Sequence, residues 1–71
     1  MDPLMAHRHL AEAERHVALA EDHVARQLAI VEELERAGHP AGLANDVLGT
    51  FRMLLASHIG HRDLIRREID A

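Results

Sequence analysis

Residues 31–44 read VEELERAGHPAGLA, and this stretch decides the fold. A helix-forming run is followed by Gly38, which suits the left-handed position just past a helix end. Pro40 comes two residues later and cannot continue the preceding helix. We therefore expect a tight turn over about 38–42, with a helix on each side of it. Because the connection is short, the two helices must pack antiparallel.

The segment before the turn, over about 3–37, has the periodicity of an amphipathic helix. Asp2-Pro3 is a good start, because aspartate accepts bonds from free amides and proline suits the first helical position. Apolar residues then follow a three-four rhythm that is typical of a coiled coil. The rhythm is carried by Ala6, Leu10, Ala13, Val17, Ala20, Val24, Leu28, Val31 and Leu34, and Gln27 also falls on the seam next to Leu28.

The segment after the turn, over about 42–69, predicts a second helix that begins near Pro40, with Asn45-Asp46 as a later alternative. Its apolar residues cover an arc of about 160°, wider than one facing helix requires. Gly49 and Gly60 lie on the opposite side, so we do not expect them to mediate packing. The arc contains Leu43, Ala44, Val47, Leu48, Phe51, Leu54, Leu55, Ile59, Ile65 and Ile69. Arg62 also falls toward this arc, where it could either snorkel toward water or pair with Glu14 or Glu21 across the seam.

These features predict an all-α fold, a single antiparallel two-helix hairpin over 1–71. A lone hairpin leaves part of each apolar face in water, and a chain of 71 residues buries only a limited core. Two hairpins pairing into a four-helix bundle would cover those faces. We therefore expect a homodimer, and the helices of another protein are the alternative cover.

Composition excludes several classes of function. The chain has no cysteine, which rules out disulfides and thiolate metal sites and fits the cytoplasm. Phe51 is the only aromatic residue and the net charge is −4, so we expect no nucleic-acid binding. No run approaches the roughly 20 apolar residues that span a bilayer, and no signal peptide is evident. We expect a cytoplasmic protein without a membrane contact.

The seven histidines are the unusual feature. His9, His16 and His23 lie seven residues apart, so they form a stripe beside the apolar seam of the first helix, which Ile30 continues. His58 lies near the centre of the apolar face of the second helix, with His61 at its edge.

One interpretation of the histidines is a metal site. His58 and His61 are spaced i, i+3, and Glu12 and His16 are spaced i, i+4, so each pair can share a ligand. His16, His58, His61 and Glu12 together offer nitrogen and oxygen donors suited to zinc or another divalent metal. The alternatives are polar rim residues of a small bundle, which need no cofactor, and a pH response in which protonation weakens dimerisation.

No catalytic signature is present. The chain has no glycine-rich phosphate loop, and Ser57 next to His58 is not a dyad, because adjacent helical residues diverge by about 100°. We expect a non-enzymatic, self-associating interaction or regulatory module. The alternatives are a metal-binding or pH-responsive hairpin and a small signalling partner that docks onto another helical domain.

The sequence also resembles a group of short, uncharacterised proteobacterial proteins that are themselves expected to be helical hairpins. The resemblance covers about 11–67. It departs from the group's pattern at Pro40-Ala41, where members often have Asp-Thr. It implies the hairpin and no activity. The matching pieces are Glu14-Arg15-His16-Val17, Asp22-His23-Val24 with Gln27, Glu33-Leu34-Glu35-Arg36 before Gly38-His39, Leu48 with Phe51, and His58 with His61-Arg62-Asp63.

Overall fold

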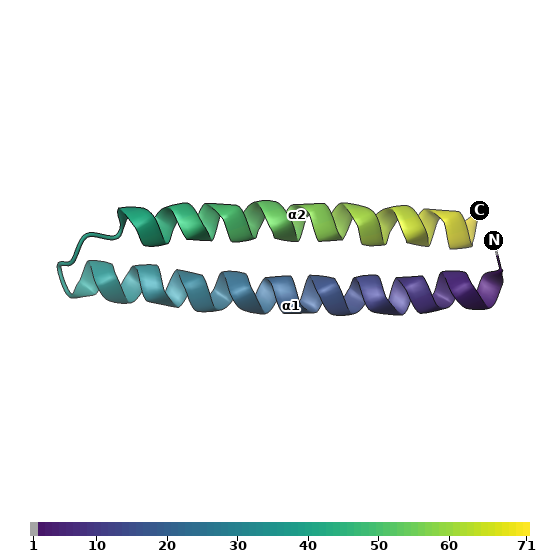
Figure 1. Cartoon of the computed structure of the whole chain (residues 1–71), viewed down its shortest axis with the longest axis horizontal. Coiled ribbons are helices and arrows are strands. Elements are labelled where there is room, and N and C mark those ends of the chain that lie inside the picture. Colours follow the sequence, from purple (N-terminus) through teal and green to yellow (C-terminus); the bar gives the residue numbers. More distant parts are fainter. Residues whose placement is uncertain (1) are drawn as a thin grey trace.

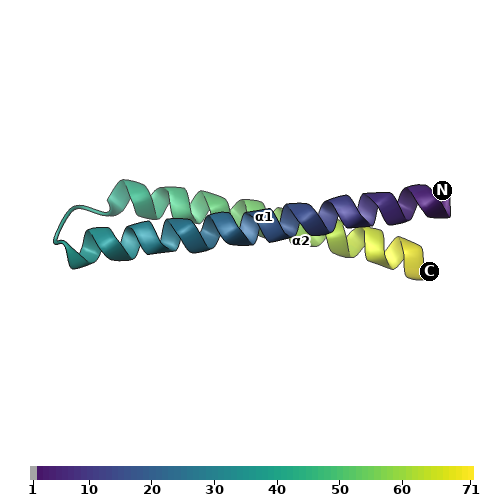
Figure 2. The same cartoon turned by 90° about the horizontal axis from the view of Figure 1, so that it is seen from below.

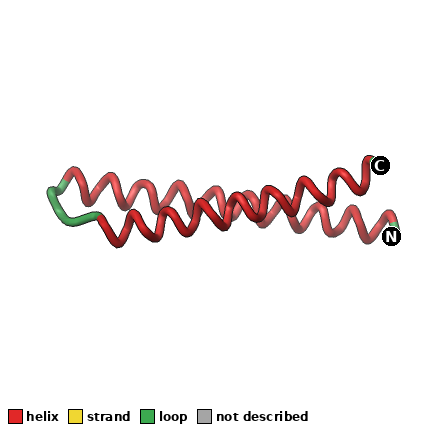
Figure 3. The backbone as a smooth tube through the Cα atoms, turned by 90° about the horizontal axis from the view of Figure 1, so that it is seen from above, coloured by secondary structure: helices red, strands yellow, loops and turns green. Residues whose placement is uncertain are grey.

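Two long helices make up the fold in a computed structural model that describes residues 2–71. Helix α1 spans Pro3–Arg36 and helix α2 spans Gly42–Asp70, and no strand occurs within residues 2–71. The helices run antiparallel, so both ends of the chain lie at the same end of the hairpin (Figure 1). They cross each other along their length rather than staying parallel (Figures 2 and 3). The expected all-helical hairpin is thus confirmed.

The start of α1 is capped as the sequence predicts. The backbone N–H of Leu4 donates to Asp2 Oδ1 at 3.1 Å, and the N–H of Ala6 donates to the Asp2 carbonyl oxygen at 3.0 Å. Pro3 occupies the first helical position, where the N–H group that proline lacks would have no partner within the helix. These contacts satisfy amide groups that have no partner inside the helix.

The turn depends on one left-handed residue. Gly38 has φ 73°, the only positive φ among residues 2–71. Its N–H donates to the Glu35 carbonyl oxygen at 3.1 Å, and the N–H of His39 donates to the Leu34 carbonyl oxygen at 2.9 Å. This pair of bonds is a Schellman cap, which satisfies carbonyl groups at the end of α1. The expected role of Gly38 is therefore confirmed.

The start of α2 is less well secured than that of α1. The helix begins at Gly42, earlier than the alternative start at Asn45-Asp46. Ala41 takes the capping position without a side-chain hydrogen bond, and no acidic residue lies in the first turn. Gln27 Nε2 of α1 donates to the Ala44 carbonyl oxygen at 2.9 Å, which ties the first turn of α2 to α1 but leaves the free amide groups of that turn uncapped.

The seam between the helices is narrow and made of small residues. Alanine is frequent on it, which lets the helices approach closely. Even the best-buried large side chain, Leu48, retains 2% exposure. The buried residues are Ala6, Ala13, Val17, Ala20, Val31, Leu48 and Ile65. The hairpin therefore has little core of its own to stabilise it.

Two details of the seam differ from the sequence prediction. Gln27 lies on the seam between Val24 and Val31 as predicted, but Leu28, which was also expected there, is 36% exposed. Both positions satisfy a three-four spacing, and the hydrogen bond from Gln27 accounts for the choice. Arg62 pairs with its neighbour Asp63, Nε to Oδ1 at 3.1 Å, and the expected pairing with a glutamate of α1 is wrong.

Neither helix would cross a membrane. Within residues 2–71 neither helix contains an apolar stretch of the length and hydropathy that a bilayer crossing needs.

Candidate interaction face

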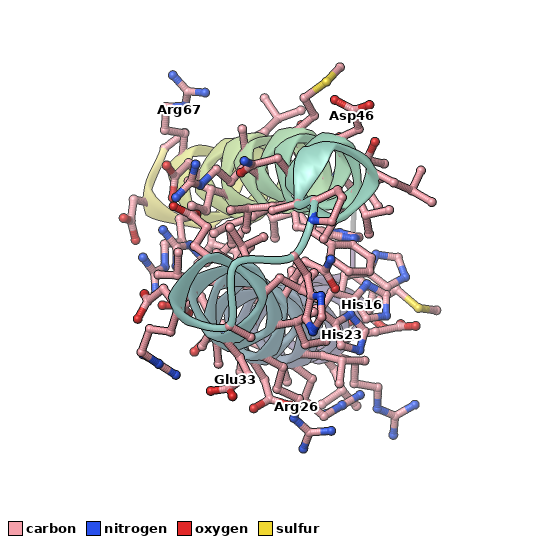
Figure 4. The ribbon with its side chains drawn as sticks, turned by 90° about the vertical axis from the view of Figure 1, so that its left-hand side faces the viewer. His16, His23, Arg26, Glu33, Asp46 and Arg67 are labelled. Carbon is pink, nitrogen blue, oxygen red and sulfur yellow. The ribbon has the colours of Figure 1, made fainter. Side chains whose placement is uncertain are left out.

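Five of the histidines lie on one flank of the hairpin. His9, His16 and His23 are two helical turns apart on α1, so they project from the same side of it. Figure 4 shows His16 and His23 on one side of the molecule and Arg67 on the other. His58 and His61 lie on the facing flank of α2. We call this surface the histidine face: His9, His16, Leu19, His23, Phe51, Leu54, His58 and His61.

A shallow apolar hollow lies at the middle of the histidine face. Its volume is about 260 Å³, and apolar atoms form most of its surface. Leu19 and Leu54 border it and are 55% and 50% exposed, although both are large aliphatic side chains. Its lining consists of His16, Leu19, Ala20, His23, Phe51, Leu54 and His58. Apolar side chains thus alternate with imidazole rings over both helices.

Imidazole rings lie against rings of the other helix on both sides of this hollow. The ring centroids of His16 and His58 are 5.4 Å apart, with the ring planes inclined by 60°. The ring centroids of His23 and Phe51 are 5.6 Å apart, with the planes inclined by 35°. These contacts join α1 to α2 at the level of the hollow.

A second hollow extends the histidine face toward the open end of the hairpin. It shares His16 with the first hollow, so the two form one continuous surface. Its lining consists of His9, Glu12, Ala13, His16 and His61.

The four residues expected to bind metal all lie on or beside this face. Glu12 Oε1 is 3.9 Å from His16 Nε2, and both side chains are about half exposed. His16 lies against His58, and His61 lines the second hollow with Glu12 and His16. Within residues 2–71, however, no three or more metal-ligating side chains are placed so that they could hold one ion. A single hairpin brings these ligands together in pairs and does not complete a site.

Charged residues gather on the opposite flank of the seam. Arg62 and Asp63 form an ion pair there. We call this surface the charged flank; by helical position it contains Glu14, Glu21, Arg52, Arg62, Asp63 and Arg66. Two further ion pairs of α1 are exposed: Arg26–Asp22 at 3.0 Å and Arg36–Glu33 at 2.7 Å. They contribute little to stability because water screens them.

The other two histidines are separate from the histidine face. His7 lines a small hollow at the open end of the hairpin together with Pro3, Ala6, Glu68 and Ile69. His39 lies in the turn and is exposed. Neither contacts the His16–His58 pair, which makes both useful as controls.

Leu19 is a residue of the histidine face that was not predicted from the sequence. Leu19 lies outside the three-four spacing of the seam residues, so that spacing does not predict it as a core residue. Its spacing does place it one turn after His16 and one turn before His23. That placement could have identified it as part of the same surface.

Comparisons of the chain with protein-family models, with curated proteins and with solved structures gave no match. The resemblance to short proteobacterial hairpins stays a prediction.

Proposed function

We propose that this chain is a non-enzymatic, self-associating helical module that acts as an interaction or regulatory protein in the cytoplasm. Two hairpins pair through their histidine faces and form a four-helix bundle. The observation that carries this proposal is that two large exposed side chains, Leu19 and Leu54, border the apolar hollow at the centre of this face.

The distribution of the large exposed apolar side chains is one-sided. Nine large apolar side chains are exposed within residues 2–71. By helical position, six of the nine lie on the histidine face or beside it: Met5, Leu19, Ile30, Leu43, Leu54 and Leu64. A contiguous apolar surface rimmed by polar groups is typical of a protein–protein interface.

The exposed area matches what one partner of a dimer would bury. The hairpin exposes 5200 Å², whereas a compact monomer of 7.9 kDa exposes about 4,400 Å². The excess of about 800 Å² equals the area that each partner buries in a standard interface. The radius of gyration of 16.2 Å also exceeds the roughly 11 Å of a compact domain of this length.

Charge permits a second copy as the occupant of this face. The net charge of −4 would oppose association of two chains if it lay in the contact. The lining of the central hollow, however, contains no carboxylate or guanidinium group, and by helical position Glu12, Arg26, Glu33 and Glu68 lie on the same flank away from that hollow. Pairing through this face therefore keeps the charged flanks of both copies in water.

The mass in solution tests this proposal. We expect sedimentation equilibrium at neutral pH to give twice the chain mass of 7.9 kDa. Leu54→Glu should shift the chain to monomer, because it places a charge in the contact. Met53→Glu is the matched control: Met53 is adjacent, 75% exposed and outside the face, so this variant should remain dimeric.

A strictly monomeric parent chain at high concentration would overturn self-association. The alternative, in which the helices of another protein cover the same face, would then take its place. Equal effects of Leu54→Glu and Met53→Glu would overturn the assignment of the face.

A further inference from the structure

We propose that His16 and His58 form half of a divalent-metal site, and that two paired hairpins complete it with four imidazole nitrogens around one zinc-like ion. This inference rests on the proposed self-association, because a single chain supplies only two ligands at this point.

The geometry of the pair fits a shared ion. A zinc–nitrogen bond is about 2.0–2.1 Å, and the ring centroid lies about 1.1 Å beyond the nitrogen. Two imidazoles on a tetrahedral ion therefore place their centroids about 5.2 Å apart. The centroids of His16 and His58 are 5.4 Å apart, and the inclined planes keep the rings from stacking.

Both rings are available as ligands. Within residues 2–71 no hydrogen bond engages the ring of His58, and His16 has only the long 3.9 Å contact to Glu12. His16 is half exposed, and His58 is partly buried beside it at the edge of the apolar hollow. An ion here would be reached from the surface that the second copy covers.

Symmetry accounts for the remaining ligands. Structural zinc sites are closed by four protein ligands, and neutral imidazole nitrogen suits zinc. In a dimer with a twofold axis, a residue pair on the axis meets its own copy. The two His16–His58 pairs then supply four ligands for one ion, which explains why no single hairpin assembles three.

The test measures dimerisation of the full-length chain with and without metal. Chelator-treated protein is titrated with zinc chloride, with magnesium chloride as the control because Mg²⁺ prefers oxygen ligands. We expect one zinc per two chains by calorimetry. The dimer dissociation constant should fall at least about tenfold with zinc and stay unchanged with magnesium.

Histidine variants locate the site. His16→Gln with His58→Gln should abolish the zinc effect, whereas His7→Gln with His39→Gln should preserve it. Circular dichroism checks that each variant stays helical. His16→Gln alone gives a second route if the His58 change disturbs the seam, because His16 is half exposed.

The outcomes separate the two proposals. A dimer in chelator whose dissociation constant does not respond to zinc overturns the metal site and leaves self-association intact. A zinc effect lost equally in both double variants, or one zinc per chain without a change in mass, also overturns the metal site. A chain that is monomeric with and without zinc overturns both. A monomer in chelator that becomes a dimer with one zinc per two chains supports the site.

Discussion

The two flanks of this hairpin border the same seam but differ in chemistry. The charged flank carries Glu14, Glu21, Arg52 and Arg66, with Arg62 paired to Asp63. The histidine face carries imidazole rings and exposed leucines around a hollow. Permanent charges resist removal from water, whereas neutral imidazoles and leucines can be buried at much lower cost. This difference supports the proposal that the charged flank stays in water and that a second copy covers the histidine face.

The largest effect concerns the seam on which both flanks depend. Leu48→Ala should lower the free energy of unfolding by about 2–5 kcal/mol, because Leu48 is the best-buried large side chain. Leu28→Ala, at an exposed position, should cost less than about 1 kcal/mol. Urea unfolding at one fixed protein concentration measures both, since dimerisation makes stability depend on concentration. Equal losses would contradict the observed placement of Gln27, rather than Leu28, in the seam.

A pH change should affect the histidine face and spare the charged flank. Histidine titrates between pH 5 and 8, and a charged imidazolium is harder to bury than a neutral one. The dimer therefore binds fewer protons than two monomers, so acid favours the monomer. We expect dimerisation to weaken about tenfold between pH 7 and pH 5 in the presence of chelator.

Sedimentation at both pH values checks this expectation. His16→Gln with His23→Gln should flatten the pH dependence, and His7→Gln with His39→Gln should leave it unchanged. A dimer that is equally strong at pH 5 and pH 7 would contradict burial of these histidines.

A smaller gain in stability is expected away from the histidine face. Gly49 lies inside α2, and a Cβ added there meets no atom within 4 Å. Gly49→Ala should therefore raise the free energy of unfolding by about 0.5–1 kcal/mol through helix propensity alone. Dimerisation should not change, and thermal unfolding together with sedimentation measures both. A weaker dimer would mean that Gly49 lies in a contact.

The smallest effect is expected on the charged flank itself. Arg66→Ala removes an exposed guanidinium that makes no ion pair within residues 2–71. Its unfolding free energy should change by less than about 0.5 kcal/mol, and its dissociation constant should stay the same. A large change in either quantity would place this flank in an interface and overturn the contrast between the two flanks.

The hairpin could be predicted because its signals are local. Gly38 before Pro40 and Asp2 before Pro3 act within one helical turn, and both behave as predicted. The exposure of Leu28 could not be predicted, since Gln27 and Leu28 both fit the spacing and a hydrogen bond from Gln27 to the other helix favours Gln27 in the seam.

The candidate site was predictable only in part. The seven-residue spacing of His9, His16 and His23 located the flank. The pairing of His16 with His58 across the helices depends on side-chain placement that no spacing encodes. Leu19 was missed because it lies outside the apolar rhythm of the seam.

Thiol labelling of single-cysteine variants tests most directly whether the histidine face is covered by a second copy. The chain has no cysteine, so Leu54→Cys and Met53→Cys each introduce one reactive group at adjacent positions. We predict that Cys at position 54 is protected at high protein concentration and becomes reactive on dilution, while Cys at position 53 reacts rapidly at both concentrations. Equal and concentration-independent labelling at the two positions would contradict the account.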